Sequence, residues 1–321
     1  MRRLLAGLAT GTLLLATAAC GSSGGSSSTS SSSGGTTTVK VGIIPIVDVA
    51  PLYLGQKEGF FSKRGLKLSM TLAQGGAAIV PGVTSGQFQF GFSNVTSLMI
   101  AQSNGVPVKA IANGVASTGV AGEDFGGLVV KKGSSITSAK QLEGKKVAVN
   151  TLKNINETAV RESVRKAGGD PDKVNFVELA FDQMPAALDK GQIDAAMAVE
   201  PALATMKLQG ATEIASPLVD VAQKLTVAMY FTSTSYARKN PGVVSKFQQA
   251  VAESLSYADA HPDQVRQIVT TYTKTPADVL AKVTLPKWPA EANRSSIETL
   301  EKLSEQDGLF KTAPDLDKLL P

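Results

Sequence analysis

Short apolar runs alternate with longer amphipathic segments along most of the chain. The runs over residues 39–46, 66–72 and 88–92 have the length and composition of buried strands, and each leads through a polar or glycine-rich turn into a helical pattern. Pro51 suits the first position of the first helix, and Gly59 suits its end. Strand, loop and helix repeated in this order predict a mainly parallel sheet with helices on both faces.

The same pattern restarts near Leu128. Strands are predicted over residues 146–149, 174–179 and 193–199, and Asn154 with Glu157 has the spacing of a capping box that opens a helix. A last apolar run over residues 226–232 predicts a strand that returns to the first sheet, and helices fill most of the remainder.

The two halves share a short phrase before a strand. Ser85-Gly-Gln-Phe precedes the third strand of the first half, and Lys190-Gly-Gln-Ile precedes the last strand of the second. We therefore expect an α/β protein of two similar lobes, with lobe one formed by residues 39–127 and 226–321 and lobe two by residues 128–225.

The N-terminus has the organisation of a secretory signal. Arg2 and Arg3 precede an apolar stretch from Leu4 to Ala19, which is shorter than the roughly 20 residues of a membrane-spanning helix. The small residues before Cys20 resemble a bacterial lipobox, so residues 1–20 are predicted to be a lipoprotein signal peptide with Cys20 as the lipidated residue. The alternative is a plain secretory signal in which the cysteine is incidental.

Residues 21–38 consist only of Gly, Ser and Thr. Such a segment has no apolar surface to bury, so it is predicted to be a flexible tether. Signal, lipid and tether together indicate a protein held outside the cell at the outer face of the membrane.

Charge and reactive side chains exclude several classes of function. The chain has 32 basic and 27 acidic residues, and removal of Arg2 and Arg3 leaves 30 against 27, a balance that does not indicate nucleic-acid binding. With one Cys and one His, the chain does not supply a zinc cluster, a disulfide or a Cys-His dyad. His261 precedes Pro262 and suits a helix end, and no phosphate or dinucleotide motif is present, so no metal and no cofactor are expected.

Several phrases along the chain resemble the solute-binding proteins of nitrate, sulfonate and taurine importers, a family that also includes binders of thiamine-precursor pyrimidines. Singly these phrases are common, and the resemblance depends on their order and spacing. They are Asp48-Val-Ala-Pro-Leu-Tyr-Leu-Gly with Glu58-Gly-Phe-Phe and Gly65-Leu, then Gly86-Gln87, Leu142-Glu-Gly-Lys-Lys-Val-Ala-Val, Ala187-Leu-Asp-Lys-Gly-Gln-Ile-Asp-Ala-Ala, Glu200-Pro201, Asp307-Gly-Leu-Phe and Pro314-Asp-Leu.

The resemblance implies a type II periplasmic-binding-protein fold, in which the chain crosses twice between two lobes and a solute binds in the cleft. It implies a monomeric binding protein, not an enzyme, that delivers a small solute to an ABC permease in the membrane. Pyrimidine-precursor synthases share the general fold and provide an alternative from another class, although their chemistry depends on His and Cys residues that this chain lacks. A structural surface lipoprotein is the third alternative.

Candidate ligand contacts follow from the rule that open α/β sheets bind ligands beyond the carboxyl ends of their strands. The turns after the predicted strands and the two crossing segments provide Asp48, Gly75, Gly76, Ser93, Asn94, Thr118, Asn150, Asn154, Asn156, Asp182, Glu200 and Tyr230.

Most of these residues also have a purely structural interpretation. Ser93, Asn154 and Asp182 suit helix N-caps, Gly75 and Gly76 suit a tight turn, and Glu200 suits the dipole of the helix opened by Pro201. Tyr230 is as compatible with packing at a hinge as with stacking on a ligand.

The predicted pocket turns carry two carboxylates and no arginine. A like charge about 6 Å from an anion costs roughly 3 kcal/mol at an effective dielectric constant near 20. Asp48 and Glu200 therefore favour a neutral or cationic polar organic solute, such as a heterocycle or an amine, although helix N-termini alone can also bind anions.

Overall fold

The computed structural model describes residues 35–321. The predicted signal peptide, Cys20 and the tether up to residue 34 lie outside the described residues. The first strand begins at Thr37, so the last two residues of the predicted tether belong to this strand.

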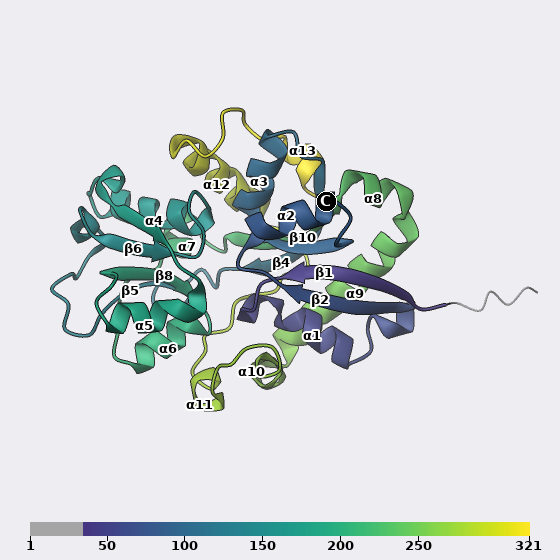
Figure 1. The fold of residues 1–321 in the computed structure, drawn as a ribbon, viewed down its shortest axis with the longest axis horizontal. Helices are drawn as coiled ribbons and strands as arrows, with labels where there is room; N and C mark the ends of the chain where they lie inside the picture. The colour runs from purple at the N-terminus through teal and green to yellow at the C-terminus, as the bar shows by residue number, and fades with distance from the viewer. Residues whose placement is uncertain (1–34) are drawn as a thin grey trace, which may run out of the picture. The chain divides into compact units, whose positions relative to one another are not determined.

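Two five-stranded sheets form the framework (Figure 1). The first has the order β2-β1-β3-β10-β4, and the second has the equivalent order β7-β6-β8-β5-β9. The strands are β1 Thr37–Ile43, β2 Leu66–Leu72, β3 Phe90–Asn94, β4 Val108–Ala116, β5 Gly126–Val130, β6 Lys146–Val149, β7 Asn175–Glu178, β8 Ala195–Val199, β9 Thr212–Ala215 and β10 Thr226–Ser233.

One strand in each sheet runs against the others. β10 is antiparallel to both β3 and β4, and β5 is antiparallel to both β8 and β9, whereas β1 is parallel to β2 and β3 and β6 is parallel to β7 and β8. The other four strands of each sheet therefore share one direction, and the predicted α/β fold class with mainly parallel sheets is confirmed.

The opposed strands are the ones that enter directly after a crossing between the sheets. The chain leaves the first sheet after β4 and enters the second as β5, and it returns after α7 (Pro217–Val221) as β10. The crossings lie at the edge of each sheet where the parallel strands end. A strand that enters after a crossing starts at this edge and therefore runs in the opposite direction. An antiparallel bridge between Ala116 and Lys287 adds a third strand segment beside the crossings.

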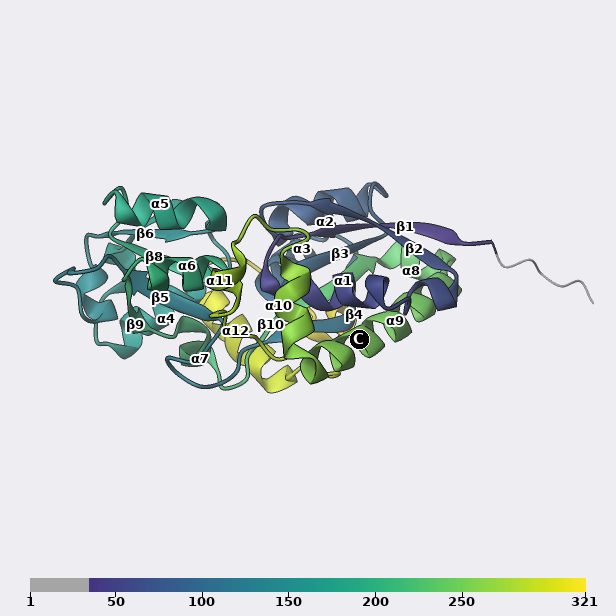
Figure 2. The same cartoon turned by 90° about the horizontal axis from the view of Figure 1, so that it is seen from below.

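Helices cover both faces of each sheet (Figures 1 and 2). On the first sheet, α2 (Gly76–Thr84), α3 (Val95–Ser103), α12 (Arg294–Gln306) and α13 (Leu316–Leu319) lie on one side, and α1 (Ala50–Lys57), α9 (Pro241–Ala260) and α10 (Pro262–Val269) on the other. The second sheet is flanked by α4 (Ile155–Lys166), α7, α5 (Met184–Asp189) and α6 (Ala202–Leu208), while α8 (Thr234–Lys239) and α11 (Ala277–Leu280) are short connecting helices. Across residues 35–321, none of the helices combines the length and apolar character that a bilayer crossing requires.

The central strands form the core. Every residue of β3 and β8 is buried, as expected of strands covered by helices on both faces. On the α9 side of the first sheet, the rings of Phe90 and Phe247 stack with centroids 3.9 Å apart. Small side chains in β8, which reads AAMAV, allow α5 and α6 to pack close to the sheet.

The phrase shared by the two halves forms the same structure twice. Gly86 follows α2 with a φ of 81°, and Gly191 follows α5 with a φ of 67°, so both occupy the left-handed position after a helix that glycine favours. These turns delay the following strands to Phe90 and Ala195, two residues later than the apolar pattern predicts.

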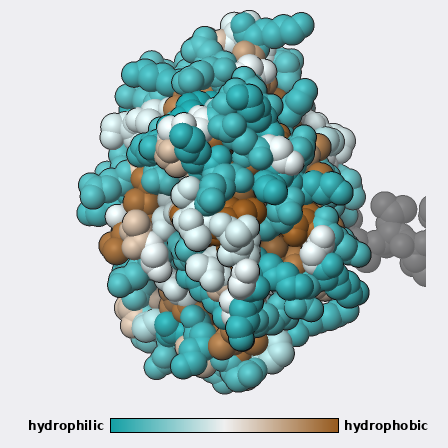
Figure 3. Space-filling view, turned by 90° about the vertical axis from the view of Figure 1, so that its left-hand side faces the viewer, coloured by the Kyte–Doolittle hydropathy of each residue, from teal (hydrophilic) through white to brown (hydrophobic). Residues whose placement is uncertain are grey.

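The surface carries few large exposed apolar side chains. Those described are Leu72, Val120, Leu152 and Leu208. On the face shown in Figure 3, hydrophobic residues occur in small groups separated by hydrophilic ones. Scattered residues of this kind are ordinary for a folded domain.

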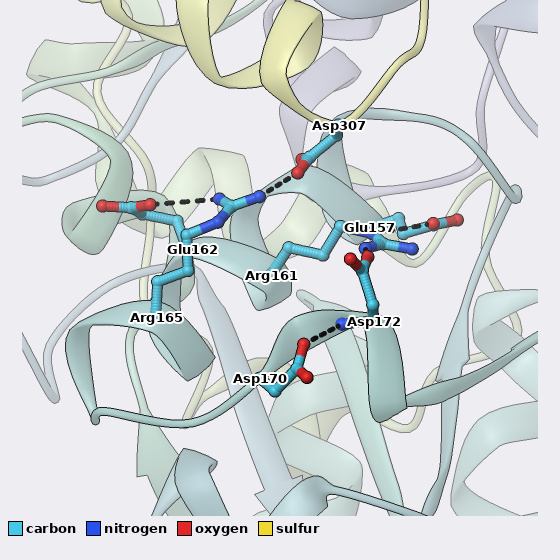
Figure 4. A network of polar contacts seen from close by, with 7 residues as sticks. All are labelled: Glu157, Arg161, Glu162, Arg165, Asp170, Asp172 and Asp307. Carbon is cyan, nitrogen blue, oxygen red and sulfur yellow. Dashed lines mark hydrogen bonds and ion pairs between the residues drawn. The ribbon is translucent and has the colours of Figure 1, made fainter.

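A polar network connects α4 with the C-terminal end of α12 (Figure 4). Arg165 pairs with Glu162 on its own helix and with Asp307, the residue that follows α12. Arg161 pairs with Glu157 and, across 2.7 Å, with Asp172. The Asp307 side chain is 1% exposed and that of Asp172 is 85% exposed, so two similar ion pairs from one helix differ in burial.

We predict that Asp307→Ala lowers the free energy of unfolding by about 2 kcal/mol, because Arg165 loses its most buried partner and keeps Glu162 alone. Asp172→Ala is the matched control and costs less than about 1 kcal/mol, because its pair with Arg161 is exposed to solvent. Denaturant titration of both variants measures the difference, and equal losses would contradict this account of the network.

Candidate functional site

A groove of about 880 Å³ lies between the two sheets. Its walls come from the carboxyl ends of β1 and β2 in the first sheet and of β7 and β8 in the second, together with a segment that follows α10. The lining residues are Ile44, Pro45, Ile46, Leu72, Ala73, Gln74, Ala180, Phe181, Asp182, Pro185, Ala186, Asp189, Lys190, Pro201, Ala202, Thr205, Gln209 and the run from Tyr272 to Pro276.

The groove lies where the strand-end rule predicts a ligand. More than half of its lining residues are apolar or aromatic, with prolines, alanines and the rings of Phe181 and Tyr272, and the polar ones include two aspartates and two lysines. This is the composition of a small-molecule site, in which apolar walls bind the body of a ligand and a few polar groups orient it.

Seven of the predicted site residues meet beside the groove, where the two sheets touch. Gln74 Nε2 donates a 3.2 Å hydrogen bond to the Asn150 carbonyl, and Asn154 Nδ2 donates a 2.7 Å bond to Ser97 Oγ. The seven are Gly75, Gly76, Ser93, Asn94, Asn150, Asn154 and Asn156.

The two glycines permit this close approach. A Cβ on Gly75 would lie 2.8 Å from Thr151 Oγ1 of the opposite lobe, and a Cβ on Gly76 would overlap the Ser93 hydroxyl. Glycine is needed at these positions because of the space and not because of a left-handed backbone.

Two asparagines of this group cap helices. Asn94, and not Ser93, is the N-cap of α3, and its Oδ1 accepts a 2.8 Å bond from Ser97 N. Asn154 caps α4 as predicted, although Glu157 accepts from Lys153 N, one residue before the position that a capping box uses. Asn156 Nδ2 donates 2.8 Å to Asn150 Oδ1, so three asparagines organise the start of α4.

Asp48 and Tyr230 are buried, and each has one side-chain oxygen without a partner among the described residues. Asp48 lies in the 3-10 turn η1 (Val47–Val49) after β1, and no described residue bonds its Oδ1 atom. Burial raises the pKa of Asp48 to about 7, and the negative charge of Asp124 adds to the rise. The Tyr230 hydroxyl, on β10, also has no partner among the described residues, and burial followed by the charge of Asp48 raises its pKa.

Glu200 has a structural role. Its Oε2 accepts a 2.8 Å bond from Ala204 N and caps α6, and its Oε1 accepts a 3.0 Å bond from Thr284 N. Burial raises its pKa to about 7 despite these bonds. The Glu200 carbonyl accepts a 3.2 Å bond from Val47 N, which joins the end of β8 to the turn that carries Asp48.

The remaining two candidates lie apart from this cluster. Asp182 lines the groove within the turn η5 (Phe181–Gln183) and is exposed, while Gln183 occupies the N-cap of α5. Thr118 lies in the first crossing, where its backbone N–H donates to Asp124 Oδ1 and its hydroxyl donates to the Glu123 carbonyl. Its polar groups serve the crossing and do not line the groove.

Two lysines and a tyrosine that line the groove are not among the residues predicted from the sequence. Lys190 and Lys274 line it together with Tyr272, whose hydroxyl donates a 3.1 Å bond to the Ile46 carbonyl. Lys190 stands in the shared phrase Lys-Gly-Gln, which marks a helix end beside a strand. Tyr272 and Lys274 follow no strand, so the strand-end rule does not find them.

The charges near the groove agree only in part with the expectation that Asp48 and Glu200 repel an anion. Arg161 and Arg165 are paired in the network described above, so the expectation that these arginines stay away from the pocket holds. The pKa values of Asp48 and Glu200 near 7 weaken the repulsion that two full carboxylates would exert on an anion. Lys190 and Lys274 add two positive charges to the lining, which Asp182 and Asp189 balance.

A family model described as "NMT1/THI5 like" matches residues 46–265 of the chain. The match includes the strand-end cluster and most of the groove.

The chain is similar in sequence to an enzyme and to a binding protein. The chain is 25% identical to the 4-amino-5-hydroxymethyl-2-methylpyrimidine phosphate synthase of Aspergillus parasiticus, over 66% of this chain and 64% of the synthase, which is less than two thirds of its length. It is also 25% identical to the taurine-binding periplasmic protein of Escherichia coli, over 70% of this chain and 68% of that protein.

Among solved structures, the ligand-binding component of an ABC-type import system from Staphylococcus aureus, with zinc bound, superposes with a TM-score of 0.77. The superposition covers 89% of this chain and 96% of that protein at 18% identity, so the two share a fold. Within residues 35–321, no group of three or more His, Cys, Asp and Glu side chains is arranged to hold a metal ion.

We predict that Asp48 makes the protein less stable as the pH rises. Its pKa is about 7 in the folded protein against 3.8 for an aspartate in water, so between these values the folded state holds a proton that the unfolded chain has lost. The stabilisation is complete below about pH 4 and disappears as the pH rises through 7, at roughly 1 kcal/mol per pH unit. Denaturant titrations from pH 5 to 8 measure the slope for the wild type and for Asp48→Asn.

Glu200 contributes in the same direction, so the wild type and Asp48→Asn both lose stability with rising pH, and the variant loses less. Identical slopes in the two proteins would show that Asp48 is ionised in the folded state.

Proposed function

Because the chain belongs to the NMT1/THI5-like family, we propose that it is the solute-binding protein of an ABC importer. The observation that carries this proposal is the groove between the carboxyl ends of two similar sheets, with walls from both lobes. A site shared by two lobes can enclose a solute when the lobes close, and closure changes the surface that a membrane permease contacts.

The groove favours an organic solute. A volume of about 880 Å³ lies within the range of pockets that hold organic ligands and far exceeds what an inorganic ion such as nitrate fills. The apolar walls, with Phe181 and Tyr272, suit a solute that has a carbon skeleton or a ring. Asp48 offers an unpaired carboxyl oxygen near this groove, which favours a neutral or cationic heterocycle or amine.

Direct hydrogen bonds across the groove suit reversible closure. The bonds Gln74 to Asn150, Asn154 to Ser97 and Val47 to Glu200 all join one lobe to the other. Each of these three is a neutral bond worth about 1 kcal/mol net. The ion pair of Arg165 with Asp307 and the bond from Thr284 N to Glu200 Oε1 join the lobes as well. A solute that contacts both lobes adds to these contacts and favours the closed state.

An enzyme of the same family is the alternative, since relatives named as pyrimidine phosphate synthases match this chain. The position of the only histidine argues against it. The His261 ring stacks on Tyr257 at 3.9 Å between α9 and α10, and its Nδ1 lies 2.7 Å from the Tyr257 carbonyl. It does not line the groove, so it is not placed to transfer a proton to or from a solute there.

The location of the protein is also a proposal. The signal sequence and the lipobox-like residues before Cys20 support an extracytoplasmic monomer anchored by a lipid to the outer face of the membrane. A Gly/Ser/Thr tether would let the binding lobes reach a neighbouring permease.

We predict that compounds released from the purified protein by denaturation include an organic solute, detectable by mass spectrometry, that raises the melting temperature when added back. Phe181→Ala should weaken its binding about tenfold, because an aromatic contact in the groove is lost. Leu208→Ala is the control, since Leu208 is an exposed apolar residue of α6 outside the groove. Catalytic turnover of the solute would favour the synthase alternative, and equal effects of the two variants would place binding elsewhere.

We also predict that Cys20→Ser moves the protein from the membrane fraction to the soluble extracellular fraction while its melting temperature stays unchanged. Fractionation of cells that express each form tests this. If the unchanged protein is already found in the soluble fraction, the anchor at Cys20 is wrong.

A further inference from the structure

Two buried carboxyl groups, of Asp48 and Asp124, form no ion pair within residues 35–321. Asp48 is 2% exposed and Asp124 is fully buried, and the charge of Asp124 raises the pKa of Asp48. Asp124 is held by Ser117 Oγ at 2.7 Å and by the backbone N–H groups of Thr118 and Phe125. No lysine or arginine of the described chain lowers the pKa of either group, so the local field is negative.

Asp48 differs from Asp124 and Glu200 because one of its carboxyl oxygens, Oδ1, is buried without a partner. Glu200 accepts with both carboxylate oxygens, and Asp124 accepts three or more bonds, whereas Asp48 Oδ1 has no partner among residues 35–321. The Tyr230 hydroxyl is also unpartnered there, and the charge of Asp48 adds to the rise of its pKa that burial causes. A buried polar group without a partner is uncommon in folded proteins and is satisfied when a ligand or a water supplies the partner.

Two aromatic side chains contact the backbone of the same segment. Trp288 Nε1 donates a 3.1 Å bond to the Asp48 carbonyl, and the Tyr272 hydroxyl donates a 3.1 Å bond to the Ile46 carbonyl. Tyr272 stacks on Tyr53 with centroids 4.0 Å apart. Aromatic rings favour an organic cation that reaches their faces, because the faces carry negative potential.

Tyr272 connects this place with the groove. Its side chain lines the groove, and its hydroxyl bonds the Ile46 carbonyl immediately before the turn of Asp48. The same turn is covered by lobe two through the bond from Val47 N to the Glu200 carbonyl. Separation of the lobes would therefore expose Asp48 to solvent, and closure would bury a solute group bound to it.

We propose that Asp48, with Tyr230 and Tyr272, binds an ammonium group of the solute while the apolar body of the solute lies in the groove. The assignment deepens the proposed solute-binding function and depends on it. It selects Asp48 over Glu200 as the residue that determines specificity for charge, because only Asp48 has an unpaired carboxyl oxygen.

The test uses a panel of paired organic compounds in which an ammonium group is replaced by a neutral hydroxyl on the same carbon skeleton. Thermal shift identifies binders, and calorimetry measures their affinities for the wild type, Asp48→Asn and Asp172→Asn. Asp172→Asn is the control, because it removes one carboxylate from an exposed position on lobe two. Circular dichroism and the melting temperature check that the variants fold.

We expect ammonium compounds to bind at least tenfold more tightly than their neutral partners. Asp48→Asn should remove that preference, and Asp172→Asn should keep it. Binding of anions or neutral compounds that is equally tight in Asp48→Asn would overturn the assignment and leave the solute-binding function intact. If no organic compound binds the wild type, the proposed function fails and the assignment with it.

Discussion

Parallel strands place their carboxyl ends at one edge of a sheet, and the two sheets of this chain turn those edges toward each other. The helices that follow the strands begin there, so their unpaired backbone N–H groups and the polar residues that cap them gather in one region. Asn94 and Asn154 satisfy two of these helix starts, and Asn154 also bonds across to Ser97. The groove, the capping residues and the contacts between the lobes all follow from this arrangement.

The same arrangement controls the electrostatics. The ends of β1 and β8 meet through Val47 and Glu200, so the carboxyl groups of Asp48 and Glu200 are both removed from water. Burial favours their protonated forms, and backbone N–H groups offset part of this effect, those of Thr284 and Ala204 for Glu200 and its own for Asp48. An unpaired buried acid is retained at a cost to stability, which is typical of functional sites.

Local patterns predicted much of the fold and less of the site. The bounds of β2 and β6 agree with the apolar runs, and the shared Lys-Gly-Gln and Ser-Gly-Gln phrases predicted helix ends that Gly191 and Gly86 form. β4 contains Lys109 and Asn113 and β9 is short and half-exposed, so neither has a clear apolar pattern. Tyr272 and Lys274 reach the groove through tertiary packing of the C-terminal segment, which no local pattern encodes. The bond from Thr284 N to Glu200 Oε1 also comes from the C-terminal segment, so no local pattern predicts it.

The central claim is that a solute binds between the carboxyl ends of the two sheets. A crystal structure of the protein with its co-purified solute tests this most directly. The account predicts electron density for an organic molecule in the groove, in contact with residues of both lobes and with Tyr272. Density for the solute at another surface, or contacts with one lobe alone, would contradict it.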